Sequence, residues 1–151
     1  MAESAFAFAA PESPGFLLWQ TTVVWQRQIK EALEPFEISH AQFVILAILL
    51  WSQEAETEPN QTLIARQSKL DKMTVSTSLK KLGVKRYVRR TESDRDPRAN
   101  SVRLTDRGKQ LATKLVPIVE GIDKTFFGVL TPTRQRELVT TLASLLREER
   151  G

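Results

Sequence analysis

The sequence predicts a mainly α-helical fold that carries one small β-hairpin. Three observations lead to this prediction: apolar residues recur at helical spacing over most of the chain, two short helices adjoin a tight turn, and the period then changes from helical to alternating. The 151 residues, 41% of them hydrophobic, can bury one core of ordinary size. We therefore expect a single compact unit.

The first predicted helix covers residues 16–33 and is amphipathic. Its apolar residues recur at spacings of seven and four: Leu18, Trp25, Ile29 and Leu33. Further apolar positions make this stripe wider than one core requires, so we expect a second buried surface, for which a second copy of the chain is a candidate. Pro35 ends the helix, and Ser39 can cap the next one, whose apolar run over 41–51 makes it central.

Two short helices are predicted over residues 60–67 and 72–82, with a tight connection between them. Asn60 is a suitable cap for the first of them. The second buries one face, because its apolar residues are spaced i, i+4 and i+7: Val75, Leu79 and Leu82. Two short helices joined in this way match the helix-turn-helix pattern.

Burying that face turns hydroxyl and ammonium groups outward, with no carboxylate among them. Such a surface suits phosphates and base edges in a major groove. A solvated helix face is the other interpretation, and the basic hairpin that follows favours DNA. The candidate DNA-binding residues in this region are Lys69, Lys72, Thr74, Ser76, Thr77, Lys80 and Lys81.

Short strands over 87–90 and 101–104 predict a hairpin with a long polar tip. At the tip, Asp96 can hold an arginine extended through charge-assisted hydrogen bonds, and Pro97 stiffens the turn, so that a guanidinium can enter a minor groove. An exposed ion pair worth at most about 1 kcal/mol is the alternative. The candidate DNA-binding residues of the hairpin are Arg90, Arg95 and Arg98, with Asp96 as wing support.

After the hairpin, Thr105 can cap a long helix that runs toward Gly128, and Thr131 with Pro132 can start a last helix. The apolar stripe of the last helix consists of Leu138, Leu142, Leu145 and Leu146.

Positive charge is concentrated in the middle of the chain. Residues 66–109 hold 14 of the 22 Lys and Arg but only 5 of the 18 Asp and Glu, so this segment carries +9 and the remainder −5. A basic segment releases counterions from a polyanion, and acidic flanks discourage binding through another face. Double-stranded nucleic acid is therefore the expected partner.

The order of these features resembles the MarR family of bacterial winged-helix repressors. The resemblance depends on two sequences that occur together: residues 96–99 at the tip of the hairpin, which is called the wing in this family, and residues 102–108, which follow the tip. It extends over residues 15–149. It implies a homodimer whose first and last two helices interlock. Each subunit would present a recognition helix to the major groove and Arg98 to the minor groove, with half-sites roughly 34 Å apart.

The resemblance also divides the chain into regions and implies a ligand. We expect a disordered arm over 1–13, a helical dimerisation region over 14–37 and 106–151, and a winged helix-turn-helix DNA-binding domain over 38–105. Proteins of the family often release DNA on binding a small aromatic or phenolic anion between the dimer helices and the winged helix. The candidate ligand-binding residues are Trp19, Trp25, His40 and Trp51, although a Trp at helical spacing is usually a core residue and a lone His near a helix start usually has a local partner.

One position departs from the family pattern. Members usually place glycine directly before the apolar pair that opens the first wing strand, whereas Arg86 stands there in this chain, and Gly83 lies three residues earlier. We therefore expect the recognition helix either to stop early or to continue into a different bend.

Several other classes of protein are excluded or disfavoured. The chain has no cysteine and one histidine, so we expect no metal and no cofactor. We find none of the patterns that indicate an enzyme: a nucleophile with a base, paired carboxylates, or a glycine-rich phosphate loop. The N-terminal residues lack an export signal, and the apolar run over 43–51 is shorter than the roughly 20 residues that cross a bilayer, so a cytoplasmic protein without membrane contact is expected. A module that docks an acidic protein through the basic segment is the alternative function.

Overall fold

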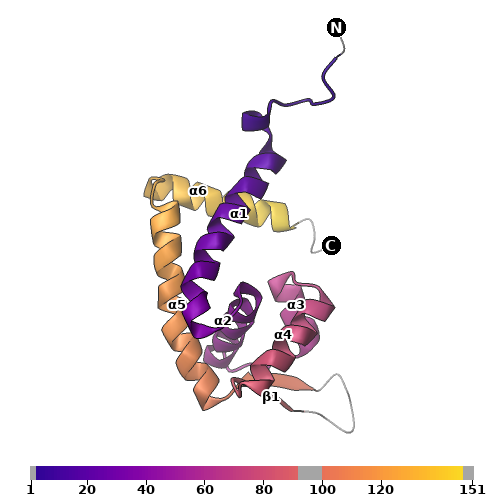
Figure 1. Ribbon diagram of the computed structural model, residues 1–151, viewed down its shortest axis with the longest axis vertical. Coiled ribbons are helices and arrows are strands. Elements are labelled where there is room, and N and C mark those ends of the chain that lie inside the picture. The colour runs from indigo at the N-terminus through magenta and orange to yellow at the C-terminus, as the bar shows by residue number, and fades with distance from the viewer. Residues whose placement is uncertain (1–2, 92–99, 148–151) are drawn as a thin grey trace.

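The computed structural model describes residues 3–91 and 100–147, and its described part is mainly helical with one antiparallel hairpin (Figure 1). This confirms the predicted fold class. The elements in order are the short 3-10 helix η1 (Ala10–Glu12), α1 (Pro14–Leu33), the 3-10 turn η2 (Glu34–Phe36), α2 (His40–Glu54), α3 (Gln61–Ser68), α4 (Lys72–Val84), β1 (Val88–Thr91), β2 (Ser101–Leu104), α5 (Asp106–Phe127) and α6 (Pro132–Arg147).

Local capping chemistry starts most of these helices where the sequence predicts. Ser39 and Gln42 form a reciprocal capping box, in which each side chain accepts a hydrogen bond from the other residue's backbone N–H at 3.1 Å. The side chains of Asn60, Thr105 and Thr131 cap α3, α5 and α6. Helix α1 begins two residues earlier than predicted, because Ser13 caps it and Pro14 occupies its first position.

The hydrophobic core is built around α2, as its nearly uninterrupted apolar run predicts. This helix is buried over most of its middle and contacts α1, α3, α4, α5 and β2. The predicted inner face of α4 joins the same core through Val75, Leu79 and Leu82, and the second half of α1 joins it through Ile29 and Leu33. One core therefore orients the helix-turn-helix relative to α1 and α5.

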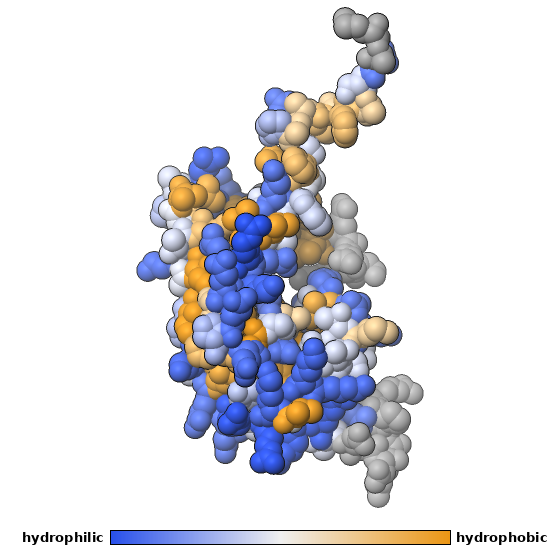
Figure 2. All heavy atoms as spheres, viewed as in Figure 1, coloured by the Kyte–Doolittle hydropathy of each residue, from blue (hydrophilic) through white to orange (hydrophobic). Residues whose placement is uncertain are grey.

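The elements separate toward two ends of the molecule. In Figure 1, α3, α4 and the hairpin lie at the lower end, α1 and α5 run upward from them, and α6 lies across the view at the height of α1, below the N-terminal segment. Figure 2 shows hydrophilic side chains over the lower end, whereas hydrophobic ones gather over the N-terminal segment, the start of α1 and α5. Residues 3–13 are exposed apart from Ser13 and include η1. The predicted division into an arm, a dimerisation region and a DNA-binding domain stays a prediction.

The chain turns from α4 into the hairpin at Arg86. Helix α4 does not stop at Gly83 but continues to Val84, and Arg86 then adopts a left-handed conformation with φ of 64°. A residue with a side chain adopts this conformation only at an energetic cost, whereas glycine adopts it freely. This difference explains why the family pattern has glycine at the position that Arg86 occupies here. The helix thus continues past Gly83, and strand β1 begins at Val88, one residue later than predicted.

The hairpin is fixed to the helices rather than free. Its strands pair from Val88 opposite Leu104 to Thr91 opposite Ser101. The backbone N–H of Val102 donates to the carbonyl of Pro59, just before α3, at 2.8 Å. This bond gives the two-stranded sheet the additional support that it requires.

Among the described residues, no single helix has both the length and the apolar character to cross a membrane; α1 with η2 and α2 meet that test jointly, across an 81° bend.

Candidate nucleic-acid interface

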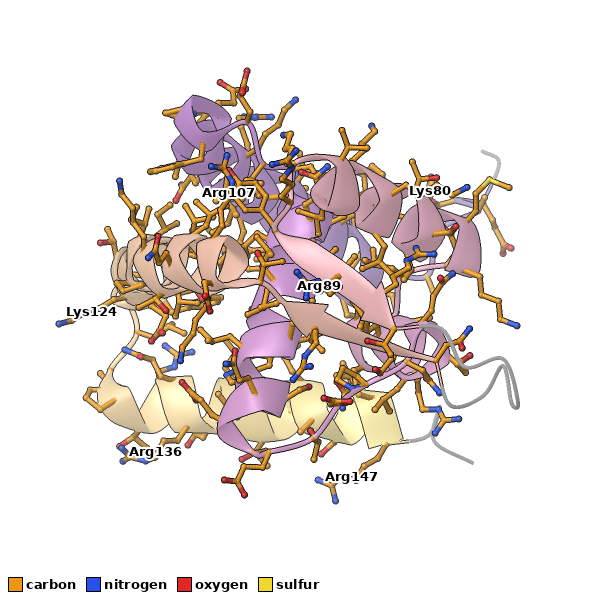
Figure 3. All side chains as sticks on the ribbon, turned by 90° about the horizontal axis from the view of Figure 1, so that it is seen from below. Lys80, Arg89, Arg107, Lys124, Arg136 and Arg147 are labelled. Carbon is orange, nitrogen blue, oxygen red and sulfur yellow. The ribbon has the colours of Figure 1, made fainter. Side chains whose placement is uncertain are left out.

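The exposed side of α4 forms a continuous stripe opposite its buried face. Residues spaced i, i+4, i+7 and i+11 follow the centre of this stripe: Met73, Thr77, Lys80 and Val84. Lys72 and Ser76 flank one edge of the stripe, and Thr74 and Lys81 flank the other. Lys80 projects from this helix in the view from below (Figure 3). The structure therefore brings the candidate residues of α4 onto one surface, to which the helix itself contributes no carboxylate; the carboxylate of the capping residue Asp71 lies at its edge, against Thr74.

Asp71 fixes the first turn of α4. One of its carboxylate oxygens accepts from the backbone N–H of Thr74 at 2.7 Å, and the other accepts from the Thr74 hydroxyl at 2.8 Å. These two hydrogen bonds lower the pKa of Asp71, so its carboxylate stays ionised. Because the Thr74 hydroxyl donates to Asp71, its oxygen is left to accept rather than donate.

The connection between α3 and α4 contains Lys69. This residue is exposed, has a left-handed conformation with φ of 62°, and ends α3 through its backbone N–H, which donates to Ala65. The next residue, Leu70, donates its backbone N–H to the hydroxyl of Ser68 at 3.2 Å. The tight turn predicted from the sequence is therefore held by local hydrogen bonds.

The wing strands carry arginines on both faces. The register places Arg89 opposite Arg103 on one face and Arg90 beside Val102 on the other. Arg103 forms an ion pair with Glu58 at 3.3 Å, and both side chains are more than half exposed. Sequence reasoning named Arg90 but missed Arg89 and Arg103, although the alternation of a strand predicts that these two share a face. The remaining hairpin candidates, Arg95, Asp96 and Arg98, lie outside the described residues.

Helix α5 holds the bend between α4 and the wing. The hydroxyl of Thr105 donates to the carbonyl of Arg86 at 2.6 Å, and Arg107 donates to the carbonyl of Lys85 at 3.2 Å while its guanidinium lies 4.9 Å from the centre of the Tyr87 ring. These contacts involve residues that sequence analysis did not select. They fix the direction in which the wing leaves the recognition helix.

Trp25 and His40 come together where α1, α2 and α5 meet. The indole N–H of Trp25 donates to the carboxylate of Asp123 at 2.8 Å, and its ring meets that of His40 edge-on, with centroids 5.1 Å apart. Burial lowers the pKa of His40, and the Asp123 carboxylate partly opposes that effect. His40 also lines a hollow of about 580 Å³ that Arg27 and Lys30 border.

Trp19 and Trp51 stand apart from this cluster. They are 68% and 67% exposed, on the first half of α1 and near the end of α2. The structure thus unites two of the four ligand candidates and adds Asp123, which lies 98 residues from Trp25 and has no local signal in the sequence. No group of three metal-ligating side chains occurs within residues 3–91 and 100–147.

Comparisons with known proteins agree with this architecture. A family model described as the ArnR1-like winged-helix domain matches residues 34–121. The uncharacterized HTH-type transcriptional regulator YdcH of Bacillus subtilis is 34% identical, over 94% of this chain and 96% of its own length. The Mycobacterium tuberculosis MarR family protein Rv2887, solved in complex with salicylic acid, is 28% identical with a TM-score of 0.68, over 91% of this chain and 99% of that one. The chain belongs to the MarR family.

A further MarR-type structure shares the fold. The Staphylococcus aureus MepR structure, a complex with DNA, has a TM-score of 0.79 at 22% identity and covers 90% of this chain and 98% of that one. The MarR-family chain is therefore a winged-helix transcriptional regulator, and these relatives are regulators rather than enzymes.

Proposed function

We propose that this MarR-family regulator binds double-stranded DNA as a homodimer and represses transcription. The observation that carries the proposal is the exposed stripe of α4, where lysines and hydroxyls lie on the face opposite the core together with Met73 and Val84, and where no residue of the helix itself carries a carboxylate. Such a face supplies cations for phosphates and polar groups for base edges. Arg89 and Arg90 add cations to the two faces of the wing, and Arg103, beside Arg89, is paired with Glu58. Repression is supported by Rv2887, which is described as a transcriptional repressor.

The dimer is supported by apolar surface that one chain leaves exposed. Helix α6 contains no buried residue within its described span, although its sequence has a leucine stripe. The first half of α1 is equally apolar and carries no charged residue over 14–26. Exposed large apolar residues in these two regions are Phe16, Leu17, Leu18, Trp19, Val24, Val139, Leu142, Leu145 and Leu146. Patches of this kind are typical of protein interfaces, and a second copy would cover both at once.

A salt titration tests DNA binding. We expect the logarithm of the association constant for a duplex from upstream of the protein's own gene to fall steeply with the logarithm of salt concentration. Lys80→Ala should reduce the magnitude of that slope by about 1 for each subunit that contacts a phosphate. The matched control is Arg136→Ala, because Arg136 is an exposed cation on α6, away from α4 (Figure 3).

Two results would contradict the proposal: a protein that stays monomeric at working concentrations, or one that ignores duplex DNA at low ionic strength. For the wing tip, Arg98→Ala should weaken specific binding by about 1 to 3 kcal/mol if Arg98 reads a groove directly. The alternative, docking of an acidic protein, predicts that polyglutamate competes as well as specific duplex does. A reporter gene behind the bound sequence distinguishes repression from activation.

The proposed ligand is a small aromatic anion bound beside Trp25 and His40. Two observations support it: the ring pair lies between the α1–α5 region and the start of α2, and Arg27 and Lys30 provide cations for a carboxylate at the hollow beside His40, whose lining also contains Glu34 and Glu37. Salicylate, which Rv2887 binds in its solved complex, is the first probe. We expect it to quench tryptophan fluorescence and release DNA, and Trp25→Phe, unlike Trp51→Phe, should remove most of the quenching.

A further inference from the structure

Met73 is an exposed apolar side chain in the first turn of α4. It is 78% exposed, while the inner face of the same helix is fully occupied by buried residues. Its spacing of four from Thr77 and seven from Lys80 places it at the centre of the outward stripe. The core therefore cannot take up this side chain, and its surroundings on the stripe are polar.

The position of Met73 along the helix limits what it can contact. In helix-turn-helix proteins the N-terminal residues of the recognition helix contact base edges, whereas later residues lie farther from them. Val84, the other large apolar residue of the stripe, is 83% exposed and lies eleven residues later, about 16 Å along the helix axis. Met73 is thus the large apolar side chain of the stripe at the N-terminal end of α4, which is the end that contacts base edges in helix-turn-helix proteins.

The first turn holds Met73 in a defined place. The Asp71 carboxylate binds both the backbone N–H and the hydroxyl of Thr74, so the backbone on both sides of Met73 is fixed. The methionine side chain itself is unbranched and adapts its shape to an apolar partner. In a major groove the apolar group available to it is the C5-methyl group of thymine, which only A·T pairs display.

We propose that Met73 contacts the C5-methyl group of a thymine in each half-site and thereby determines part of the DNA sequence preference. The inference rests on the proposed function, since it requires α4 to enter the major groove. It assigns an apolar contact to the N-terminal part of a surface whose neighbouring side chains there donate or accept hydrogen bonds.

Removal of single methyl groups from the DNA tests this contact. Duplexes are first selected from a random pool by the wild-type protein, and each thymine is then replaced in turn by deoxyuridine, which lacks the C5-methyl group. At one thymine per half-site we expect an affinity loss of about fourfold for each methyl removed, which corresponds to the burial of roughly one methyl group. Met73→Ala should bind the thymine and uracil duplexes equally well at that position, which a double-mutant cycle measures directly.

Two further variants keep the test specific. Val84→Ala is the matched control and should retain the wild-type response to uracil at every position. Met73→Leu keeps an apolar side chain and should retain a preference for thymine. Because Met73 is exposed, we expect substitutions at this position to leave the urea midpoint of unfolding close to that of the wild-type protein.

The outcomes separate the inference from the proposed function. If selected duplexes bind tightly but no thymine shows a methyl effect that Met73→Ala abolishes, the inference is wrong and DNA binding stands. If the selected half-sites contain no thymine, the inference is also wrong. If the wild-type protein binds no duplex even at low ionic strength, the proposed function fails, and the inference fails with it.

Discussion

Replacing Gly108 with alanine should destabilise the junction between α5 and the wing. A Cβ atom at this position would lie 1.9 Å from the carbonyl oxygen of Tyr87 and 2.8 Å from its carbon. Because real Cβ contacts essentially never fall below 3.0 Å, the two backbones would have to separate by about 1.1 Å. The same carbonyl accepts the backbone N–H of Thr105 at 3.1 Å, so the movement also breaks a hydrogen bond.

The expected magnitude follows from three contributions. Overpacking of a close contact costs about 1 to 3 kcal/mol. The lost hydrogen bond costs about 1 kcal/mol, and the higher helix propensity of alanine returns up to about 1 kcal/mol. The net loss in the free energy of unfolding is about 2 kcal/mol, which for a chain of this size lowers Tm by about 4 to 8 °C.

Thermal unfolding followed by circular dichroism at one fixed protein concentration measures this change, since association would otherwise shift Tm. Gly83→Ala is the matched control: nothing lies within 4 Å of its Cβ position, so we expect a gain of about 0.5 to 1 kcal/mol. A Gly108→Ala variant that melts within about 1 °C of wild type would refute the close approach of α5 to Tyr87. Equal losses in the two variants would refute the steric explanation.

Three other predictions concern the bend and the ring cluster. Arg86→Gly should raise the urea midpoint by an amount equivalent to about 0.5 to 1 kcal/mol, because glycine adopts φ of 64° without strain; a lowered midpoint would contradict this. Burial lowers the pKa of His40 in the folded protein, so as the pH falls the imidazole of the unfolded chain is protonated before that of the folded chain. The free energy of unfolding should therefore be unaffected by His40 above about pH 6.5 and should decrease as the pH falls below that value. Urea midpoints at pH 7.5 and 5.5 should therefore differ less in His40→Gln than in wild type, and an equal difference would exclude His40 as the cause. Trp25→Phe should lower the free energy of unfolding by about 1 to 2 kcal/mol, because the Asp123 carboxylate loses its hydrogen-bond donor. Trp51→Phe, at an exposed position, should lower it by less than about 0.5 kcal/mol. Equal decreases in urea unfolding would contradict a stabilising role for this hydrogen bond.

Features governed by neighbouring residues could be predicted from the sequence. The caps at Ser39, Asn60 and Thr105 depend on hydrogen bonds that span three residues, and each is present. The inner face of α4 follows from helical periodicity, which a short buried helix obeys strictly. The fold class therefore followed from local chemistry and periodicity.

Features that depend on distant residues could not be predicted in the same way. The hydrogen bond from Trp25 to Asp123 joins α1 to α5, and no pattern around either residue indicates it. The consequence of Arg86 was open because the backbone of this bend is also held by Thr105 and Arg107 from α5. A search of the sequence for hydrogen-bonding side chains omits Met73, although its spacing of four from Thr77 places both residues on one stripe.

The attachment of the hairpin at both strand ends has a mechanical consequence. Val102 is bound to the segment before α3, and Thr105 is bound to Arg86, the second residue after α4, so the hairpin is held at both ends of β2 and is fixed relative to the neighbouring helices. In the proposed DNA complex, each chain therefore presents a surface of fixed span to its half-site. In the proposed dimer, tolerance of longer or shorter operators comes from movement between the two copies, and we expect substitutions that change this tolerance to map to α1, α5 and α6.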